Sequence, residues 1–408
     1  MKKSVLRSYA NLIAKTGVNV QKGQEVVITA DLDQPEFVKM VVEECYKLGA
    51  SKVVVNWMYQ GLDKINTRYR SMKTLGTVEK WEIERLAHYS EILPCRIYLE
   101  SEDPDGLKGI NQKKYTHALQ SMYKAFKPYR DKMENRYQWC IAAVPGEKWA
   151  KKLFPELSKK QAIEKLWEKI LMTSRVTEDP NQAWKEHNDE LLEHCAYLTG
   201  LGIESLHYES SNGTDFTVGL IPKGRFQGGG ERSRQGIYFN PNIPTEECFT
   251  SPMKGKADGI VYATKPLSYQ GELIDKFWIR FKDGKAVEWD AQQGKELLTK
   301  MITMDENAGY LGECALVPYD SPINNSGILF YNTLFDENAV CHLALGRGFN
   351  DCIQEFEKFT DEECKEMGIN DSLIHVDFMI GSPDLCITAK CRDGRTVKIF
   401  ENGNWAKR

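Results

Sequence analysis

The first half of the chain alternates between short apolar runs and segments with a helical repeat of apolar residues. Residues 25–30 and 52–57 are rich in β-branched side chains, and apolar residues at helical spacing fill residues 34–48, before Gly49. The alternation continues with a helix near 78–92, a strand near 96–100, a helix near 111–134 and a strand at 138–144. Strands that are apolar on both faces and separated by helices are typical of a largely parallel sheet with helices on both sides. The sequence therefore predicts an α/β N-terminal domain with a three-layer, Rossmann-like architecture.

The second half of the chain has a different pattern, in which short strands dominate. An amphipathic helix at 180–198 closes the first half, and Asp283-Gly284 and Asp393-Gly394 predict hairpin turns further on. We expect strands at 203–209, 216–220, 259–264, 276–282, 286–290, 373–380, 385–390 and 396–400, with helices near 292–304 and 360–367. The sequence thus predicts two domains, an α/β domain at 1–182 and an α+β, mainly antiparallel domain at 183–408.

The composition is that of a folded, water-soluble chain. It has 408 residues, of which 41% are hydrophobic, and a net charge of −4. No signal peptide or membrane anchor is evident, and no run approaches the roughly 18 apolar residues that span a bilayer. Eleven cysteines without a Cys-x-x-Cys pair indicate reduced thiols and predict a cytoplasmic protein. The slight acidic excess predicts no nucleic-acid partner, and the missing Gly-x-Gly-x-x-Gly turn disfavours a nucleotide.

Two histidines and three carboxylates stand inside otherwise apolar runs of the second half. They are His342, His375 and Asp377, preceded by Glu247 and Glu313. On a strand, the His-x-Asp pair places both side chains on one face about 7 Å apart at the backbone, because side chains alternate between faces. Two imidazoles and three carboxylates suit one divalent metal ion or two neighbouring ones.

Other interpretations of these residues are weighed against a metal site. A carboxylate such as Glu313, buried within Leu311–Val317, costs several kcal/mol unless a cation is near, and that cation could be a Lys or Arg side chain. Each histidine alone could be an ordinary hydrogen-bonded core residue. The joint occurrence of all five residues in one domain favours metal. The neighbouring Cys248, Cys314 and Cys341 are interpreted as core filling, because strand alternation points them away from an inward ligand.

Several segments resemble the thermophilic-type metalloaminopeptidases, the family of aminopeptidase T, aminopeptidase S and aminopeptidase II. The N-terminal part of the resemblance consists of Tyr9-Ala10, Gly17–Gln24, Tyr46–Ala50 and Val54–Trp57. The second half contains segments similar to the metal-binding motifs of the family, in the same order: Asn242–Glu247, Leu311–Glu313, His342–Gly346 and His375–Gly381. The resemblance covers nearly the whole chain.

The resemblance implies an intracellular exopeptidase with two co-catalytic divalent ions in each subunit of a homodimer. Its motifs carry over Glu247, Glu313, His342, His375 and Asp377 as metal ligands, with Glu313 also the catalytic residue. Family members have a metal-binding Tyr seven residues after the first histidine, where this chain has Phe349. A sixth ligand is therefore not carried over.

We therefore expect a metal-dependent aminopeptidase that removes N-terminal residues from short peptides by a two-metal activated water. The expected cofactors are two zinc or cobalt ions per subunit, with manganese or magnesium as alternatives. Peptide substrates and a second copy of the chain are the expected partners, without nucleic acid or membrane. The sequence leaves open a two-metal amidohydrolase that acts on a non-peptide amide, and a non-catalytic relative that binds peptide or metal. It also leaves open which carboxylate bridges the ions.

Overall fold

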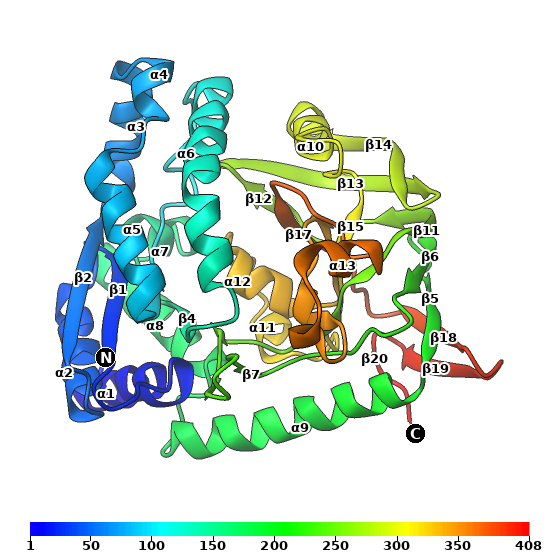
Figure 1. Ribbon diagram of the computed structural model, residues 1–408, viewed down its shortest axis with the longest axis horizontal. Coiled ribbons are helices and arrows are strands. Elements are labelled where there is room, and N and C mark those ends of the chain that lie inside the picture. Colours follow the sequence, from blue (N-terminus) through cyan, green and yellow to red (C-terminus); the bar gives the residue numbers. More distant parts are fainter. Residues whose placement is uncertain (408) are drawn as a thin grey trace. The chain divides into compact units, whose positions relative to one another are not determined.

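The computed structural model describes residues 1–407 and divides the chain into two compact units. Unit 1 consists of Met1–Glu186 and Gly230–Pro244, and unit 2 consists of His187–Gly229 and the chain from Thr245 onward. Figure 1 shows helices around a sheet in unit 1 and mostly strands in unit 2. The chain is thus a mixed α/β protein with one parallel sheet and several antiparallel ones.

Unit 1 is built on a five-stranded sheet in the order β2-β1-β3-β4-β9, in which every pair is parallel. Its strands are β1 (Glu25–Asp31), β2 (Lys52–Met58), β3 (Cys95–Glu100), β4 (Trp139–Ala143) and β9 (Asn242–Ile243). The first four are the strands that the apolar runs predict. The last was not predicted, and its pairing with β4 brings residues 230–244 into unit 1, whereas the sequence analysis assigned them to the second domain.

Helices cover both faces of the parallel sheet. Val27 of β1 clusters with Tyr89 and Met133, so α5 (Lys80–Ile92) and α6 (Gln112–Met133) cover its face of the sheet. The crossover from β1 to β2 runs in the opposite direction to the later ones, so its helix α2 (Pro35–Lys47) covers the other face. There the rings of Tyr9 and Phe37 stack 5.4 Å apart, which joins α1 (Lys3–Leu12) to α2. The remaining elements of unit 1 are η1 (Ile13–Gly17), α3 (Gln60–Tyr69), α4 (Met72–Leu75), α7 (Glu147–Leu153), α8 (Lys159–Thr173), β7 (Glu231–Arg232) and β8 (Tyr238–Phe239), with α9 (Pro180–Gly200) running on into unit 2.

Unit 2 contains a nine-stranded and a four-stranded antiparallel sheet. The larger has the order β12-β13-β11-β6-β5-β18-β19-β20, with β14 also paired to β13. Its strands are β5 (Ile203–Glu209), β6 (Asp215–Leu220), β11 (Pro252–Tyr262), β12 (Leu267–Tyr269), β13 (Glu272–Lys282), β14 (Lys285–Gln293), β18 (Cys386–Cys391), β19 (Thr396–Glu401) and β20 (Asn404–Trp405). The smaller, in the order β10-β15-β16-β17, consists of β10 (Cys248–Thr250), β15 (Leu311–Leu316), β16 (His342–Gly346) and β17 (His375–Met379).

The helical elements of unit 2 are short and lie between its strands. They are α10 (Lys295–Ile302), α11 (Pro322–Asn325), α12 (Thr333–Asp336), η2 (Glu337–Ala339), η3 (Asn350–Cys352), η4 (Phe356–Lys358) and α13 (Asp361–Glu366). The two predicted hairpin turns are confirmed, since β13 pairs with β14 and β18 with β19. At the first of them Asp283 and Gly284 both have positive φ, at 50° and 82°, as the favoured two-residue hairpin turn requires.

The main hydrophobic core of unit 2 joins one face of each sheet. Phe216, Phe281 and Ile387 of the larger sheet belong to the same buried cluster as Leu343 and Phe378 of the smaller one. Only one face of the four-stranded sheet is used in this way, because side chains alternate along each strand. Its other face is left for polar residues.

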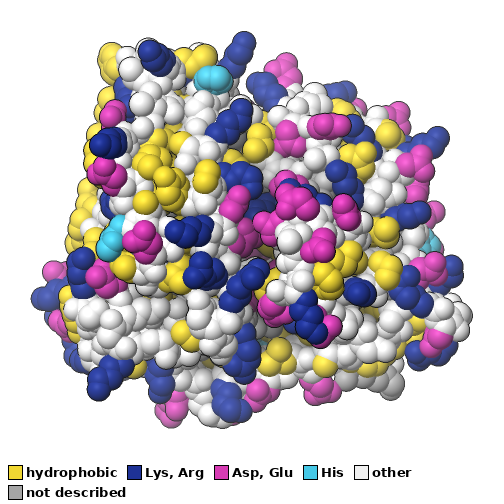
Figure 2. All heavy atoms as spheres, viewed as in Figure 1, with side chains coloured by type: hydrophobic (Ala, Val, Ile, Leu, Met, Phe, Trp, Pro, Cys, Tyr) yellow, Lys and Arg dark blue, Asp and Glu magenta, His cyan; other side chains and the backbone are white. Residues whose placement is uncertain are grey.

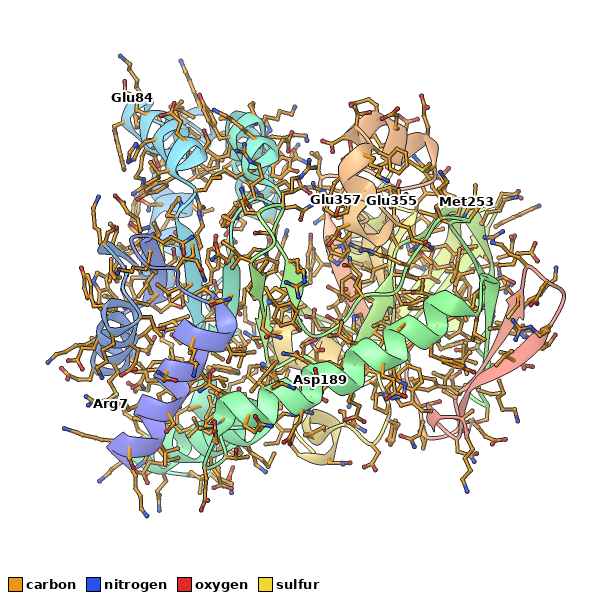
Figure 3. All side chains as sticks on the ribbon, turned by 60° about the horizontal axis from the view of Figure 1, so that its bottom comes forward. Arg7, Glu84, Asp189, Met253, Glu355 and Glu357 are labelled. Carbon is orange, nitrogen blue, oxygen red and sulfur yellow. The ribbon has the colours of Figure 1, made fainter. Side chains whose placement is uncertain are left out.

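The surface carries charges of both signs. Figure 2 shows Lys and Arg side chains interspersed with Asp and Glu over the visible face. Glu355 and Glu357, labelled in Figure 3, are exposed on either side of the buried Phe356. Among the described residues, no helix combines the length and the apolar character that crossing a membrane requires.

Candidate metal centre

The five residues singled out in the sequence come together at the four-stranded sheet. Glu247 directly precedes β10, Glu313 lies on β15, His342 begins β16, and β17 carries both His375 and Asp377. The sequence neighbours of these residues lie in the hydrophobic core instead. Cys248, Cys314 and Leu343 follow Glu247, Glu313 and His342, and Val376 and Phe378 flank Asp377. Strand alternation thus separates a polar face from an apolar one. The interpretation of the neighbouring cysteines as core filling is confirmed for Cys248, Cys314 and Cys341.

The strand register explains how the carboxylates meet. Ala344 on the central strand pairs with Glu313 on one side and with Asp377 on the other, so the three residues form one row across the sheet. The register shifts between Leu311 and Glu313, which marks a β-bulge at Gly312. The extra residue lets Leu311 lie in the core while Glu313 joins the polar face. A side chain at Gly312 is not tolerated, because a Cβ atom there would lie 2.1 Å from the carbonyl oxygen of Arg347.

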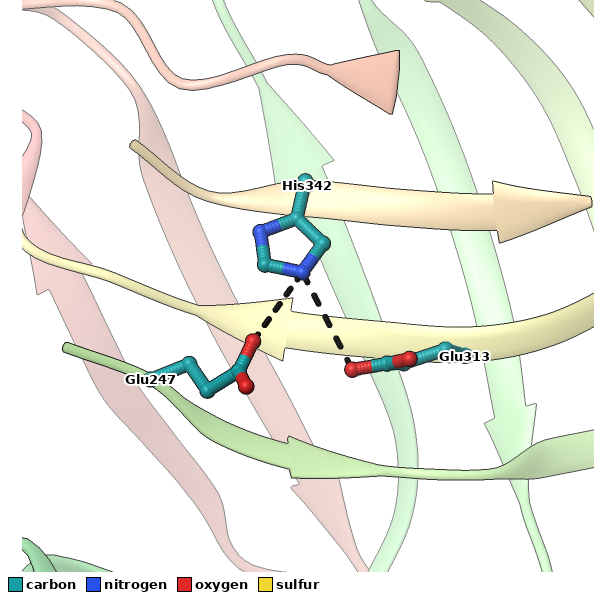
Figure 4. A group of neighbouring side chains, drawn as sticks. All are labelled: Glu247, Glu313 and His342. Carbon is teal, nitrogen blue, oxygen red and sulfur yellow. Dashed lines mark ion pairs between the residues drawn. The ribbon is translucent and has the colours of Figure 1, made fainter. Parts of the chain in front are cut away.

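Glu313 stands between the two histidines and presents one oxygen to each. Its Oε1 lies 3.8 Å from Nε2 of His342, and its Oε2 lies 3.1 Å from Nε2 of His375. Glu247 completes the first side, with Oε2 3.2 Å from Nε2 of His342 (Figure 4). Asp377 completes the second, with Oδ1 3.4 Å from Nε2 of His375. The result is two groups of three donors that share Glu313, one with Glu247 and His342 and one with His375 and Asp377.

The histidine rings are oriented with Nε2 toward the carboxylates. Nδ1 of His375 lies 2.7 Å from the carbonyl oxygen of Arg347, and Nδ1 of His342 lies 3.4 Å from that of Val340. A ring that donates its Nδ1 proton to a carbonyl keeps the Nε2 lone pair for a metal ion, as in many histidine sites. The backbone therefore selects the tautomer that suits a ligand.

Without a metal ion, protons hold this cluster together. Burial would lower the pKa of His342, but its hydrogen bond to Glu247 and the surrounding carboxylates raise that pKa to about 9. Burial would also lower the pKa of His375, yet Asp377 and Glu313 raise it well above its usual range. Burial, with the charges of Glu247 and Asp377, raises the pKa of Glu313 to about 7. A bound cation would replace these protons, so metal uptake should release them.

The donor set fits a divalent ion better than a salt bridge. Glu313 is 4% exposed, and its ion-pair partners within residues 1–407 are the two histidines rather than any Lys or Arg. The Oδ1 atom of Asp377 is buried and has no hydrogen-bond partner among residues 1–407. In each group the three donor atoms lie within 4.8 Å of one another. Carboxylate oxygens and imidazole nitrogens at such spacing suit zinc, cobalt or manganese.

Phe349 lies at the edge of this centre. Its ring is 4.9 Å from that of His375 and 5.7 Å from that of Phe249, and its backbone N–H donates to Oγ of Ser251. The position where the resembling family has Tyr therefore contacts one of the five donors, His375.

Two further acidic residues are near the centre. Glu246 is buried, and its Oε2 lies 3.8 Å from Nε2 of His187. Glu337 on η2 shares a hydrogen bond with Asp377. Glu337 is not among the residues predicted from the sequence, because it lies between Asp336 and Asn338 and lacks the apolar neighbours that mark the other carboxylates.

Comparisons with known proteins agree with a metal-dependent peptidase. The sequence matches the thermophilic metalloprotease (M29) family over residues 2–405. It is 41% identical over 403 residues to aminopeptidase AmpS of Bacillus subtilis (strain 168), covering 98% of each chain. It is 35% identical over 402 residues to aminopeptidase T of Thermus aquaticus, again covering 98% of each.

One solved structure of an aminopeptidase is closely similar to this chain. Wild-type AmpT from Thermus thermophilus superimposes with a TM-score of 0.90 at 35% identity, covering 99% of this chain and 100% of that one. A dihydroxypyridine dioxygenase from Pseudomonas putida KT2440 gives a TM-score of 0.54 at 12% identity, which indicates a shared fold alone. The match over nearly the full sequence, together with the closely similar structure, shows that the chain belongs to the thermophilic metalloprotease (M29) family and is a metalloaminopeptidase.

Proposed function

We propose that this aminopeptidase hydrolyses short peptides with two divalent ions held by five residues. Glu247, Glu313 and His342 would hold one ion, and Glu313, His375 and Asp377 the other. The observation that carries this proposal is the position of Glu313, whose two oxygens face different histidines. A carboxylate that offers one oxygen to each of two donor groups suits a bridging ligand. We therefore assign the bridge to Glu313.

Two neighbouring divalent ions supply a water nucleophile at neutral pH and polarise the scissile carbonyl. The chain's own residues prepare this chemistry. The carbonyl oxygens of Arg347 and Val340 orient the two imidazoles, and the row formed by Glu313, Ala344 and Asp377 fixes the carboxylates. Because four of the five donors lie on strands, and Glu247 directly precedes one, they are held rigidly before the ions bind.

The proposal also covers the metal, the cellular compartment and the oligomeric state. The oxygen and nitrogen donors favour zinc or cobalt, with manganese or magnesium as weaker candidates. We further propose that the protein is cytoplasmic and forms a homodimer. Eleven free cysteines, ten of them buried, support a reducing compartment.

The test is metal removal and return. The protein is dialysed against a chelator, and hydrolysis of leucyl and alanyl 4-nitroanilides is followed before and after adding zinc, cobalt or manganese. Activity should vanish and return at two ions per chain, as measured by elemental analysis. N-acetylated anilides serve as controls for aminopeptidase action. Hydrolysis of other amides alone would indicate an amidohydrolase, and metal binding without turnover would indicate a non-catalytic relative.

A further inference from the structure

Glu337 is a carboxylate at the metal centre that belongs to neither group of donors. Its helical turn η2 packs against β17, the strand that carries His375 and Asp377. Its side chain is half-buried and shares a hydrogen bond with Asp377. Burial and the charges of Asp377, Glu247 and Glu313 raise the pKa of Glu337 well above its usual range. Glu337 therefore lies beside the donors without being one of them.

The neighbouring Asn338 holds this turn in place. Its side chain is fully buried and donates to the carbonyl oxygen of Leu334 at 3.0 Å and to Oε1 of Glu337 at 3.3 Å. Its Oδ1 accepts the backbone N–H of Glu246 at 2.8 Å. One amide thus ties Glu337 to the segment that carries Glu247. Asn338 thus restricts the position of Glu337.

Glu337 has no Lys or Arg partner among the described residues. The preceding Asp336 accepts hydrogen bonds from the backbone N–H groups of Phe330 and Asn332, at 2.8 and 3.1 Å, and Lys265 supplies a nearby positive charge. Within residues 1–407, by contrast, no Lys or Arg forms an ion pair with Glu337. A partly buried carboxylate is stabilised when a cation comes close to it.

Building on the proposed function, we propose that Glu337 receives the α-ammonium group of the substrate's N-terminal residue. This group is the one positive charge that every aminopeptidase substrate carries and that every N-acylated peptide lacks. A hydrogen bond between an ammonium and a carboxylate is stronger than a neutral one. A blocked N-terminus would bring no cation to the carboxylate of Glu337, which disfavours such peptides. Glu337 is thus a specificity-determining residue beside the bond that is cleaved.

The test compares ligands that differ only in the amino group. Binding of L-leucine and 4-methylpentanoate, and of L-alanine and propanoate, is measured by calorimetry with the metal-loaded enzyme and its Glu337→Gln and Glu337→Asp variants. Glu337→Gln should weaken binding of the amino acids by roughly ten- to hundredfold. Binding of the two deaminated acids should stay unchanged. Glu337→Asp, which keeps the charge, should recover part of the lost affinity.

Three further measurements make the outcome specific. Elemental analysis should find the same metal content in Glu337→Gln as in the parent protein. The KM for leucyl 4-nitroanilide should rise more than kcat falls. The control variant Glu355→Gln removes a carboxylate that is 66% exposed on the same unit and should leave all values unchanged. Circular dichroism establishes that each variant is folded.

The possible failures are distinguishable. If the parent enzyme hydrolyses no aminoacyl anilide with any metal, the proposed function itself is wrong. If the parent enzyme is active and Glu337→Gln binds leucine as tightly as before, the role of Glu337 is wrong and the function stands. A loss of metal from Glu337→Gln would make Glu337 a ligand, and equal losses for the amino and the deaminated acids would make its role structural. Both outcomes overturn the inference.

Discussion

Replacing the adjacent residues Glu313 and Cys314 of β15 should affect different properties: the first metal binding, the second the stability of the fold. Glu313→Gln keeps one side-chain oxygen but turns the other into an amide nitrogen that has no lone pair for a cation. Because the two oxygens of Glu313 face different histidines, at least one donor group then falls from three donors to two. Loss of a residue that merely orients a ligand commonly costs about 10- to 100-fold in metal affinity. We therefore expect Glu313→Gln to cost at least about 100-fold.

Cys314→Ala changes the other face of the same strand. Cys314 is fully buried in the main core of unit 2, and shortening it should cost on the order of 1 kcal/mol of the free energy of unfolding. For a domain of this size that corresponds to a drop of about 2–4 °C in Tm. Metal content and activity should not change. In the metal-free protein, Glu313→Gln should not lower the free energy of unfolding at pH 8. Burial raises the pKa of Glu313 to about 7, so the ionised side chain is unfavourable there, and Gln removes that charge.

The assay is a graded chelator titration followed by elemental analysis, with Tm measured by scanning calorimetry on the same samples. Glu355→Gln is the control for loss of a carboxylate. If Cys314→Ala loses metal as readily as Glu313→Gln, the two faces of β15 do not have separate roles. If Glu313→Gln retains both ions at parental affinity, Glu313 is not a ligand of either ion.

Further expectations concern the fold, the histidines and Phe349. Chelation should abolish activity while the circular dichroism spectrum stays largely intact, because unit 2 has its own apolar core; a spectrum that collapses on chelation would contradict this. His342→Ala should lower metal content and activity together, whereas His207→Ala should not, since His207 is paired with Asp215 at 2.9 Å on a different strand. In the metal-free protein the pKa of His342 rises from 6.5 to about 9 on folding. Protonated His342 therefore stabilises the fold fully below pH 6.5, and this contribution is lost as the pH rises through 9. In urea titrations, the free energy of unfolding of chelated His342→Ala should not show this decrease with pH. Phe349→Tyr should hold the weaker ion more tightly in a chelator titration, because the ring already packs on His375; superimposable curves would show that residue 349 does not reach the metal.

Much of the architecture could be predicted from apolar patterns. The strands of the parallel sheet were recognisable because they are apolar on both faces, and the hairpins because Asp-Gly pairs mark their turns. β9 could not be predicted, since two residues carry no periodic signal and its partner β4 is about 100 positions away in sequence. For the same reason, the sequence could not predict that residues 230–244 belong to unit 1.

For the candidate site, the sequence reveals most of the residues but not how they come together. Glu313, His342 and Asp377 stand out because each is a polar residue in an apolar run. Their convergence depends on the register of β15, β16 and β17, and on the bulge at Gly312, which no local pattern reveals. Glu337 lies in a polar segment and becomes visible only when η2 is seen packed against β17.

Whether Glu313 joins two metal ions is tested most directly by a crystal structure of the metal-loaded protein, with anomalous diffraction recorded at the absorption edge of the bound metal. We expect two peaks about 3.5–4 Å apart. One should lie beside Glu247 and His342, the other beside His375 and Asp377, with an oxygen of Glu313 on each. A single peak, or two peaks that do not share Glu313, would contradict this expectation.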